Sequence, residues 1–137
     1  MGKNKILFLK EENFISSIHY IEKKEDIYSI KSELNSLAKR HFFSISEYRK
    51  LVRKQLPLKN KIPIYFSPSL LLFCIRERNC CYWINYFNIL KICYEENIII
   101  IFKDGSILEV DVKKKILLQE LEKINKVLAY KKELDLW

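Results

Sequence analysis

Basic side chains gather in one stretch of this sequence, and the chemistry open to them is the binding of anions. Between Lys39 and Lys61 there are eight lysine or arginine residues against one acidic residue, which is +7 of the formal net charge of +8. All five arginines lie between positions 40 and 78, whereas lysines occur along the whole chain. Such uneven placement of positive charge is typical of a protein that binds a polyanion.

The strongest candidates for anion binding are expected on one helix within this stretch. Arg49 and Arg53 are four residues apart, and so are Lys50 and Lys54, so each pair falls on one side of a helix. A solvated helix face in this chain would mix Glu with Lys, and the near absence of acids therefore favours nucleic acid as the partner. A solvated surface without a partner is the alternative interpretation of this charge run.

The rest of the chain offers few residues that could form a metal site or an enzyme active site. His19 and His41 fall in different predicted elements, and no Walker A, G-x-G-x-x-G or G-x-S-x-G motif occurs. The cysteines contain no C-x2-C pair and are expected to be reduced, small apolar residues: Cys74, Cys80, Cys81 and Cys93. We therefore predict no enzyme activity, no cofactor and no metal site.

Apolar runs bounded by turn residues predict a β-rich chain. The four isoleucines at 98–101 are expected to form an interior strand, and the Asp104–Gly105 pair predicts a tight hairpin after it. Strands are expected over residues 5–9, 15–21, 26–30, on both sides of a turn at 67–69, and over 80–87, 88–94, 97–102 and 107–112.

Helical periodicity occurs in the middle of the chain. A first helix is expected from Ser32, its predicted N-cap, with an apolar face of Leu34, Leu37, Ala38, His41 and Phe42. A second follows from a capping box of Ser44 and Glu47 and ends before Pro57. Its apolar face is expected to comprise Ile45, Tyr48, Val52 and Leu56. These two helices carry most of the basic stretch.

A further amphipathic helix is expected from Lys115 to near the end of the chain. Its buried face is predicted to comprise Leu117, Leu121, Ile124 and Leu128. Its charged face is predicted to comprise Glu120, Lys123 and Lys126.

These elements together predict a single α+β domain over residues 1–137. We expect an antiparallel sheet or a small half-open barrel of pleckstrin-homology-like shape, with a central basic helical insertion and a C-terminal helix. No apolar run approaches the roughly 18–20 residues of a membrane span, and the N-terminal apolar run is too short for a signal peptide. We therefore expect a cytoplasmic protein that does not enter a membrane.

Two segments together resemble the family of the competence transcription factor ComK. They are "LAKRHFFSISEYRK" and, after a basic spacer, "KIPIYFSPSLLLFCIRERNCCYWI". The residues that carry the resemblance are Phe42, Phe43, Ser44, Ser46, Tyr48, Arg49, Lys50, Lys61, Pro63, Ile64, Pro68, Ser69, Cys81, Trp83 and Ile84. Weaker similarity extends over nearly the whole chain.

The resemblance implies a DNA-binding regulator of competence-type genes that recognises A/T-rich boxes, mainly through the minor groove, as a homodimer or higher oligomer. Arginine suits a narrow A/T minor groove because its guanidinium is less strongly hydrated than an ammonium. A regulatory adaptor protein is left open as an additional partner. The candidate DNA-binding residues are Lys39, Arg40, Ser44, Ser46, Tyr48, Arg49, Lys50, Arg53, Lys54, Lys61, Arg76 and Arg78.

Within this set, Arg49 and Arg53 are expected to enter the groove, and Arg76 with Arg78 to form a second patch. The lysines are expected to contact phosphates, and Ser44 or Ser46 to contact phosphate at a helix start. Phe42 and Phe43 are expected in the core rather than as wedges between bases.

Three alternatives stay open at this point. The two central helices could form a helix-turn-helix that reads the major groove instead. The chain could be a pleckstrin-homology-like interaction module whose basic segment binds an acidic protein or an anionic membrane surface. It could also modulate a full-length relative by forming mixed dimers with it.

Overall fold

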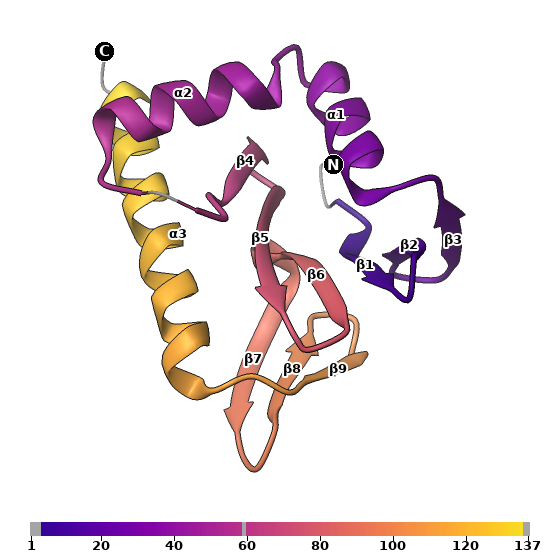
Figure 1. Cartoon of the computed structure of the whole chain (residues 1–137). Helices are drawn as coiled ribbons and strands as arrows, with labels where there is room; N and C mark the ends of the chain where they lie inside the picture. Colours follow the sequence, from indigo (N-terminus) through magenta and orange to yellow (C-terminus); the bar gives the residue numbers. More distant parts are fainter. Residues whose placement is uncertain (1–3, 59, 136–137) are drawn as a thin grey trace.

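The computed structural model describes residues 4–58 and 60–135 and confirms the α+β class. The strands of this part form two open antiparallel sheets and no closed barrel, which agrees with the half-open arrangement expected (Figure 1). In chain order the elements are β1 (Ile6–Glu12), β2 (Ile15–Tyr20), β3 (Lys24–Ile27), α1 (Ile30–Arg40), α2 (Ile45–Gln55), β4 (Ile64–Ser67), β5 (Leu70–Arg76), β6 (Cys80–Asn85), the 3-10 turn η1 (Tyr86–Asn88), β7 (Ile89–Tyr94), β8 (Ile98–Phe102), β9 (Ile107–Val110) and α3 (Lys114–Asp135).

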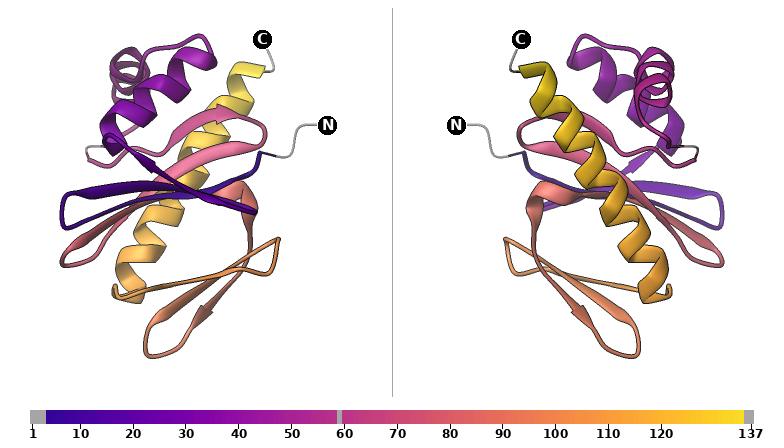
Figure 2. Two further views of the ribbon diagram at one scale, coloured as in Figure 1. Left: turned by 90° about the vertical axis from the view of Figure 1, so that its right-hand side faces the viewer. Right: turned by 90° about the vertical axis from the view of Figure 1, so that its left-hand side faces the viewer.

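The larger sheet has the strand order β3-β2-β1-β6-β5-β4, and both of its faces are covered. On one face α1 and α2 pack Leu34, Leu37 and Ile45 against the strands. On the other face the β7-β8-β9 sheet and α3 complete the core (Figure 2). Two-sided burial explains why the sequence of β5 is apolar at six consecutive positions, because no side chain from Leu70 to Ile75 reaches solvent.

The smaller sheet follows the hairpins that the sequence predicts. The isoleucine strand β8 lies between β7 and β9, which confirms the expected interior position. Gly105 has a φ of 90° in the turn between β8 and β9, a conformation that glycine adopts without steric cost. The strand expected over 80–87 instead ends at Asn85, because the Asn85 side chain accepts a hydrogen bond from the Phe87 amide and caps η1.

Helix α1 begins two residues before the predicted N-terminal cap. Ser29, rather than Ser32, is the N-cap, and its hydroxyl accepts the Ser32 backbone N–H at 3.0 Å. The prediction that Phe42 belongs to the apolar face of this helix is also wrong, because Phe42 is 97% exposed. The cap of α2 is as predicted: the Ser44 hydroxyl accepts from the Glu47 backbone N–H.

The ending of α1 explains the position of Phe42. The Phe43 amide donates to the Ala38 carbonyl and the Phe42 amide to the Lys39 carbonyl, the two bonds of a Schellman motif. This motif requires a left-handed residue, which is usually glycine, and here Phe42 takes the position with a φ of 63°. Phe42 therefore turns outward, while Phe43 packs against the core beside Tyr48 and Phe66.

The charged face predicted for α3 is wrong at Glu120. That side chain is 5% exposed, and the Lys123 ammonium binds it at 2.9 Å while also donating to the Asn60 carbonyl at 2.9 Å. The carboxylate is buried because the second half of α3 packs against α2, where Val127 contacts Val52 in a small apolar cluster. An ion pair at this contact helps α3 to fix the segment that leads into β4.

Asn85 is a fully buried polar residue at the end of β6, a central strand of the larger sheet. Its amide group donates to the carbonyls of Ile6 and Ser69, and its carbonyl oxygen accepts from the amides of Leu71 and Phe87. One side chain thus ties β1, the β4–β5 turn, β5 and η1 together. Buried backbone groups need such partners because water cannot reach them.

Replacing Asn85 by leucine is expected to lower the free energy of unfolding by about 3 kcal/mol. The side chain keeps nearly the same volume, but the buried backbone groups that Asn85 satisfies lose their hydrogen-bond partner. Urea denaturation checks this. The exposed Asn125 in α3 provides a matched control, and Asn125→Leu is expected to change stability by less than about 0.5 kcal/mol. Equal effects of the two substitutions would contradict the role assigned to Asn85.

Candidate functional site

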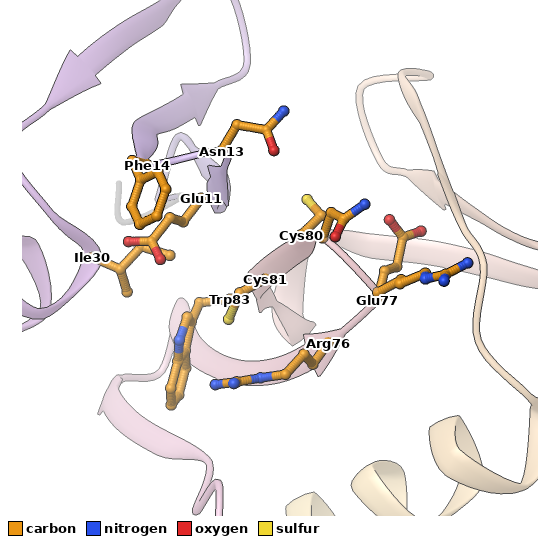
Figure 3. Close-up of a pocket in the computed structure, with 11 residues that line it drawn as sticks. Glu11, Asn13, Phe14, Ile30, Arg76, Glu77, Cys80, Cys81 and Trp83 are labelled. Carbon is orange, nitrogen blue, oxygen red and sulfur yellow. The ribbon is translucent and has the colours of Figure 1, made fainter.

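A basic trough runs along the side of the molecule where the two covering helices meet the ends of the strands. It consists of three adjoining hollows. The first lies at the tips of the β1–β2 and β5–β6 hairpins, has a volume of about 490 Å³, and includes Phe14, Arg76, Arg78 and Trp83 in its lining. In Figure 3 the Arg76 side chain points toward Trp83 from the neighbouring strand.

The second and third hollows extend the trough over α1 and α2, at about 430 Å³ each. The second shares Ile30 and Trp83 with the first, and adds Lys31, Ser46 and Arg49. The third shares Asn35 and Ile45 with the second, and adds residues of α1 and of the turn that follows it: Ser32, Ser36, Lys39, Phe43 and Ser44. Trp83, 8% exposed, therefore lies between two clusters of cations that are far apart in sequence.

Positive charge predominates in this trough. Five cations line it, namely Lys31, Lys39, Arg49, Arg76 and Arg78, and none of them has an ion pair among the described contacts. Two acids line it as well, Glu11 and Glu77, both at the hairpin tips. Each carboxylate accepts a hydrogen bond from the protein itself, from the Ser16 hydroxyl at 3.3 Å and from the Asp111 backbone amide respectively.

Cys74 and Cys81 form a thiol pair next to Arg76, with 3.6 Å between their sulfur atoms. The hydrogen bond from Cys74 lowers the pKa of Cys81 to about 7, and the cations of Arg76 and Lys61 act in the same direction against partial burial and Glu11. The same hydrogen bond and burial raise the pKa of Cys74. Lys61 acts electrostatically on both thiols, and Cys81 itself lines the first hollow, so this predicted cation lies near the trough.

The structure thus brings together a part of the predicted DNA-binding set and leaves the rest apart. Lys39, Ser44, Ser46, Arg49, Arg76 and Arg78 line the trough, and Lys61 lies near it. Four other members are exposed but line none of these hollows: Arg40, Lys50, Arg53 and Lys54. Arg40 is paired with Glu33 at 3.3 Å and Lys50 with Glu47 at 3.9 Å. Lys59, part of the basic stretch, lies outside the described residues.

The Tyr48 hydroxyl is used in hydrogen bonds within the fold. It donates to the Pro63 carbonyl at 2.7 Å and accepts the Tyr65 amide at 3.2 Å, which fastens α2 to β4. Burial raises the pKa of Tyr48 to about 12, so the hydroxyl keeps its proton at neutral pH. We therefore assign Tyr48 a role in positioning Arg49 rather than in contacting a ligand.

Two phenylalanines project fully into solvent from left-handed backbone positions. Phe14 is 102% exposed with a φ of 66°, and Phe42 is 97% exposed with a φ of 63°. Phe14 lines the first hollow, whereas Phe42 lines none of the three. The sequence analysis missed Phe14 and Lys31; the turn residue Asn13, between two predicted strands, is the signal that could have placed Phe14 at a hairpin tip.

Comparison of the chain with protein-family models, with curated proteins and with solved structures finds no match in any of the three. No helix among the described residues has the length and apolar character needed to cross a membrane. In that same part of the chain, no three His, Cys, Asp or Glu side chains are grouped as they would need to be to hold a metal ion.

The thiol pair predicts a pH-dependent reactivity. Alkylation of Cys81 by iodoacetamide is expected to reach half its maximal rate at a pH of about 7, because only the thiolate reacts and its pKa is lowered to about 7. Cys74→Ala removes the hydrogen-bond donor and should move the midpoint upward toward about 8.5. Cys74→Ser keeps a donor and is the control. Mass spectrometry of the modified peptide gives the rate; a wild-type midpoint near 8.5 would contradict the geometry.

The left-handed phenylalanines predict that glycine stabilises the fold at both positions. Phe14→Gly and Phe42→Gly are each expected to raise the free energy of unfolding by about 0.5–1 kcal/mol, because relief of the left-handed strain exceeds the entropy cost of glycine. Thermal or urea unfolding measures this change. Phe14→Ala and Phe42→Ala keep a Cβ atom and should give no gain. A loss of stability with glycine would show that the rings contribute to the fold.

Proposed function

We propose that this protein is a DNA-binding regulator that holds A/T-rich duplex DNA in the basic trough, in keeping with its resemblance to the ComK family. The observation that carries the proposal is the convergence of cations from separate segments. Arg49 comes from α2, Lys31 and Lys39 come from α1, and Arg76 with Arg78 come from the β5–β6 hairpin. A polyanion is the ligand class that such a lining attracts.

The arginines suit the minor groove of A/T-rich DNA. A-tracts have a narrow minor groove with enhanced negative potential, and a guanidinium enters it at a lower desolvation cost than an ammonium. Arg76 and Arg78 lie at the end of β5 and in the turn after it, on a protruding hairpin tip. We assign the groove contacts to these two residues and to Arg49.

The remaining polar groups of the trough suit the sugar-phosphate backbone. Lys31, Lys39 and Lys61 are exposed ammonium groups, and Ser46 lies in the first turn of α2 beside Arg49. Phosphate contacts of this kind fix the position of a protein on DNA without reading bases. Their release of counterions makes binding depend steeply on salt.

The proposal is tested by fluorescence anisotropy with two duplexes of equal length, one with paired A/T-rich boxes and one G/C-rich, over a salt series. Wild-type protein is expected to prefer the A/T duplex. Arg76→Ala/Arg78→Ala is expected to weaken binding at least tenfold, since each groove arginine contributes about 1–3 kcal/mol. The slope of log affinity against log salt should fall by about 1–2, because each cation that no longer neutralises DNA charge changes the slope by about 0.9.

Lys91→Ala/Lys103→Ala is the matched control, because both lysines are exposed and belong to the β7–β9 side of the molecule. This variant loses the same formal charge and should bind like the wild type. Equal binding of both duplexes would contradict the assignment to A/T-rich DNA. Binding to vesicles of anionic phospholipid, with no binding to either duplex, would instead favour a membrane-surface module.

A further inference from the structure

We propose that Phe14 is a wedge that inserts between adjacent base pairs of the DNA held in the trough, unstacking them and kinking the duplex. This inference rests on the proposed function and goes beyond it, since it assigns a distortion of the ligand to one residue. Apolar side chains that enter the minor groove act in this way when they stand beside arginines that hold the backbone or the groove floor.

The conformation of Phe14 is the first observation. Asn13 and Phe14 form the two-residue turn between β1 and β2, with φ values of 51° and 66°. Turns with two left-handed residues favour Asn-Gly, so the first position carries the expected residue and the second does not. A bulky side chain in this region is uncommon and marks a position where function opposes local preference.

The exposure of the ring is the second observation. Phe14 is 102% exposed, and its neighbour Ile15 is 68% exposed, so the hairpin ends in an apolar tip that the fold does not bury. A phenyl ring that makes no core contact contributes nothing to stability by burial. The ring is therefore available to a partner that meets the tip from outside.

The position of the tip is the third observation. Strand β1 pairs with β6 through Glu12 opposite Cys80 and Glu11 opposite Cys81, so the β1–β2 tip lies beside the β5–β6 tip that carries Arg78. Phe14 and Arg78 line the same hollow, and Figure 3 shows Phe14 on the side of that hollow opposite Arg76. An exposed aromatic ring that lines the same hollow as two guanidinium groups matches the chemistry of a partly unstacked base step.

Phe42 allows the effect of position beside the trough to be distinguished from the effect of exposure alone. It shares the left-handed backbone and the full exposure of Phe14, but it lies at the turn between α1 and α2 and lines none of the three hollows. Replacing either phenylalanine by glycine removes one exposed phenyl group and relieves the same kind of left-handed backbone strain. Of these two rings, Phe14 is the one that lines a hollow of the trough.

The experiment uses the full chain and A/T-box duplexes in which 2-aminopurine replaces adenine at one position at a time. Its fluorescence rises when a base loses its stacking partner. Wild type and Phe42→Gly are expected to raise the emission at one base step. Phe14→Gly is expected to give no rise, to bind about tenfold more weakly through loss of one stacking contact, and to keep the salt dependence of the wild type. Circular dichroism and thermal unfolding verify that each variant is folded.

An equal rise in emission with Phe14→Gly would overturn the inference. So would wild-type binding without a rise at any base step, although the proposed DNA-binding function would then stand. Absence of wild-type binding to every duplex would overturn the proposed function and this inference with it. Loss of the rise in Phe42→Gly as well as in Phe14→Gly would also contradict it, because the effect would then follow exposed rings in general.

Discussion

Burial of the six-stranded sheet on both faces is the constraint on which the rest of the structure depends. Strand β5 has no exposed side chain before Arg76, because α1 and α2 cover one face while the second sheet and α3 cover the other. A partner can therefore meet the central strands of this sheet only at their ends and hairpin tips. The trough is one such place, where Trp83 and Ile30 form the floor between α1, α2 and two hairpin tips.

Buried polar contacts then set the positions of the groups that line the trough. Asn85 connects β1 with β5 and η1, and the Tyr48 hydroxyl connects α2 with β4. Because Arg49 follows Tyr48 directly, the contact that orients α2 also places this arginine in the hollow that Trp83 and Lys31 line. Functional side chains on the surface are thus positioned by hydrogen bonds in the interior, as a preorganised binding site requires.

Local patterns in the sequence predict the parts of this fold that depend on local chemistry. The Ser44 cap, the hairpin at Gly105 and the interior isoleucine strand follow from short-range rules and are confirmed. Phe42 and Glu120 were mispredicted because periodicity does not show where a helix reverses or what a second helix covers. The clustering of arginines in the sequence indicated a polyanion site. That Arg49 and Arg76 lie on either side of Trp83 depends on the order of strands in the sheet, which local sequence patterns do not encode.

The central claim is that nucleic acid occupies the trough rather than the outer face of the helices, and the five arginines allow a direct test. Arginine side-chain Nε–Hε signals can be followed by NMR while an A/T-box duplex is added. The account predicts large shifts for Arg49, Arg76 and Arg78, and little change for Arg40, which is paired with Glu33 and lines none of the three hollows. Shifts confined to Arg40, with the three trough arginines unmoved, would contradict it.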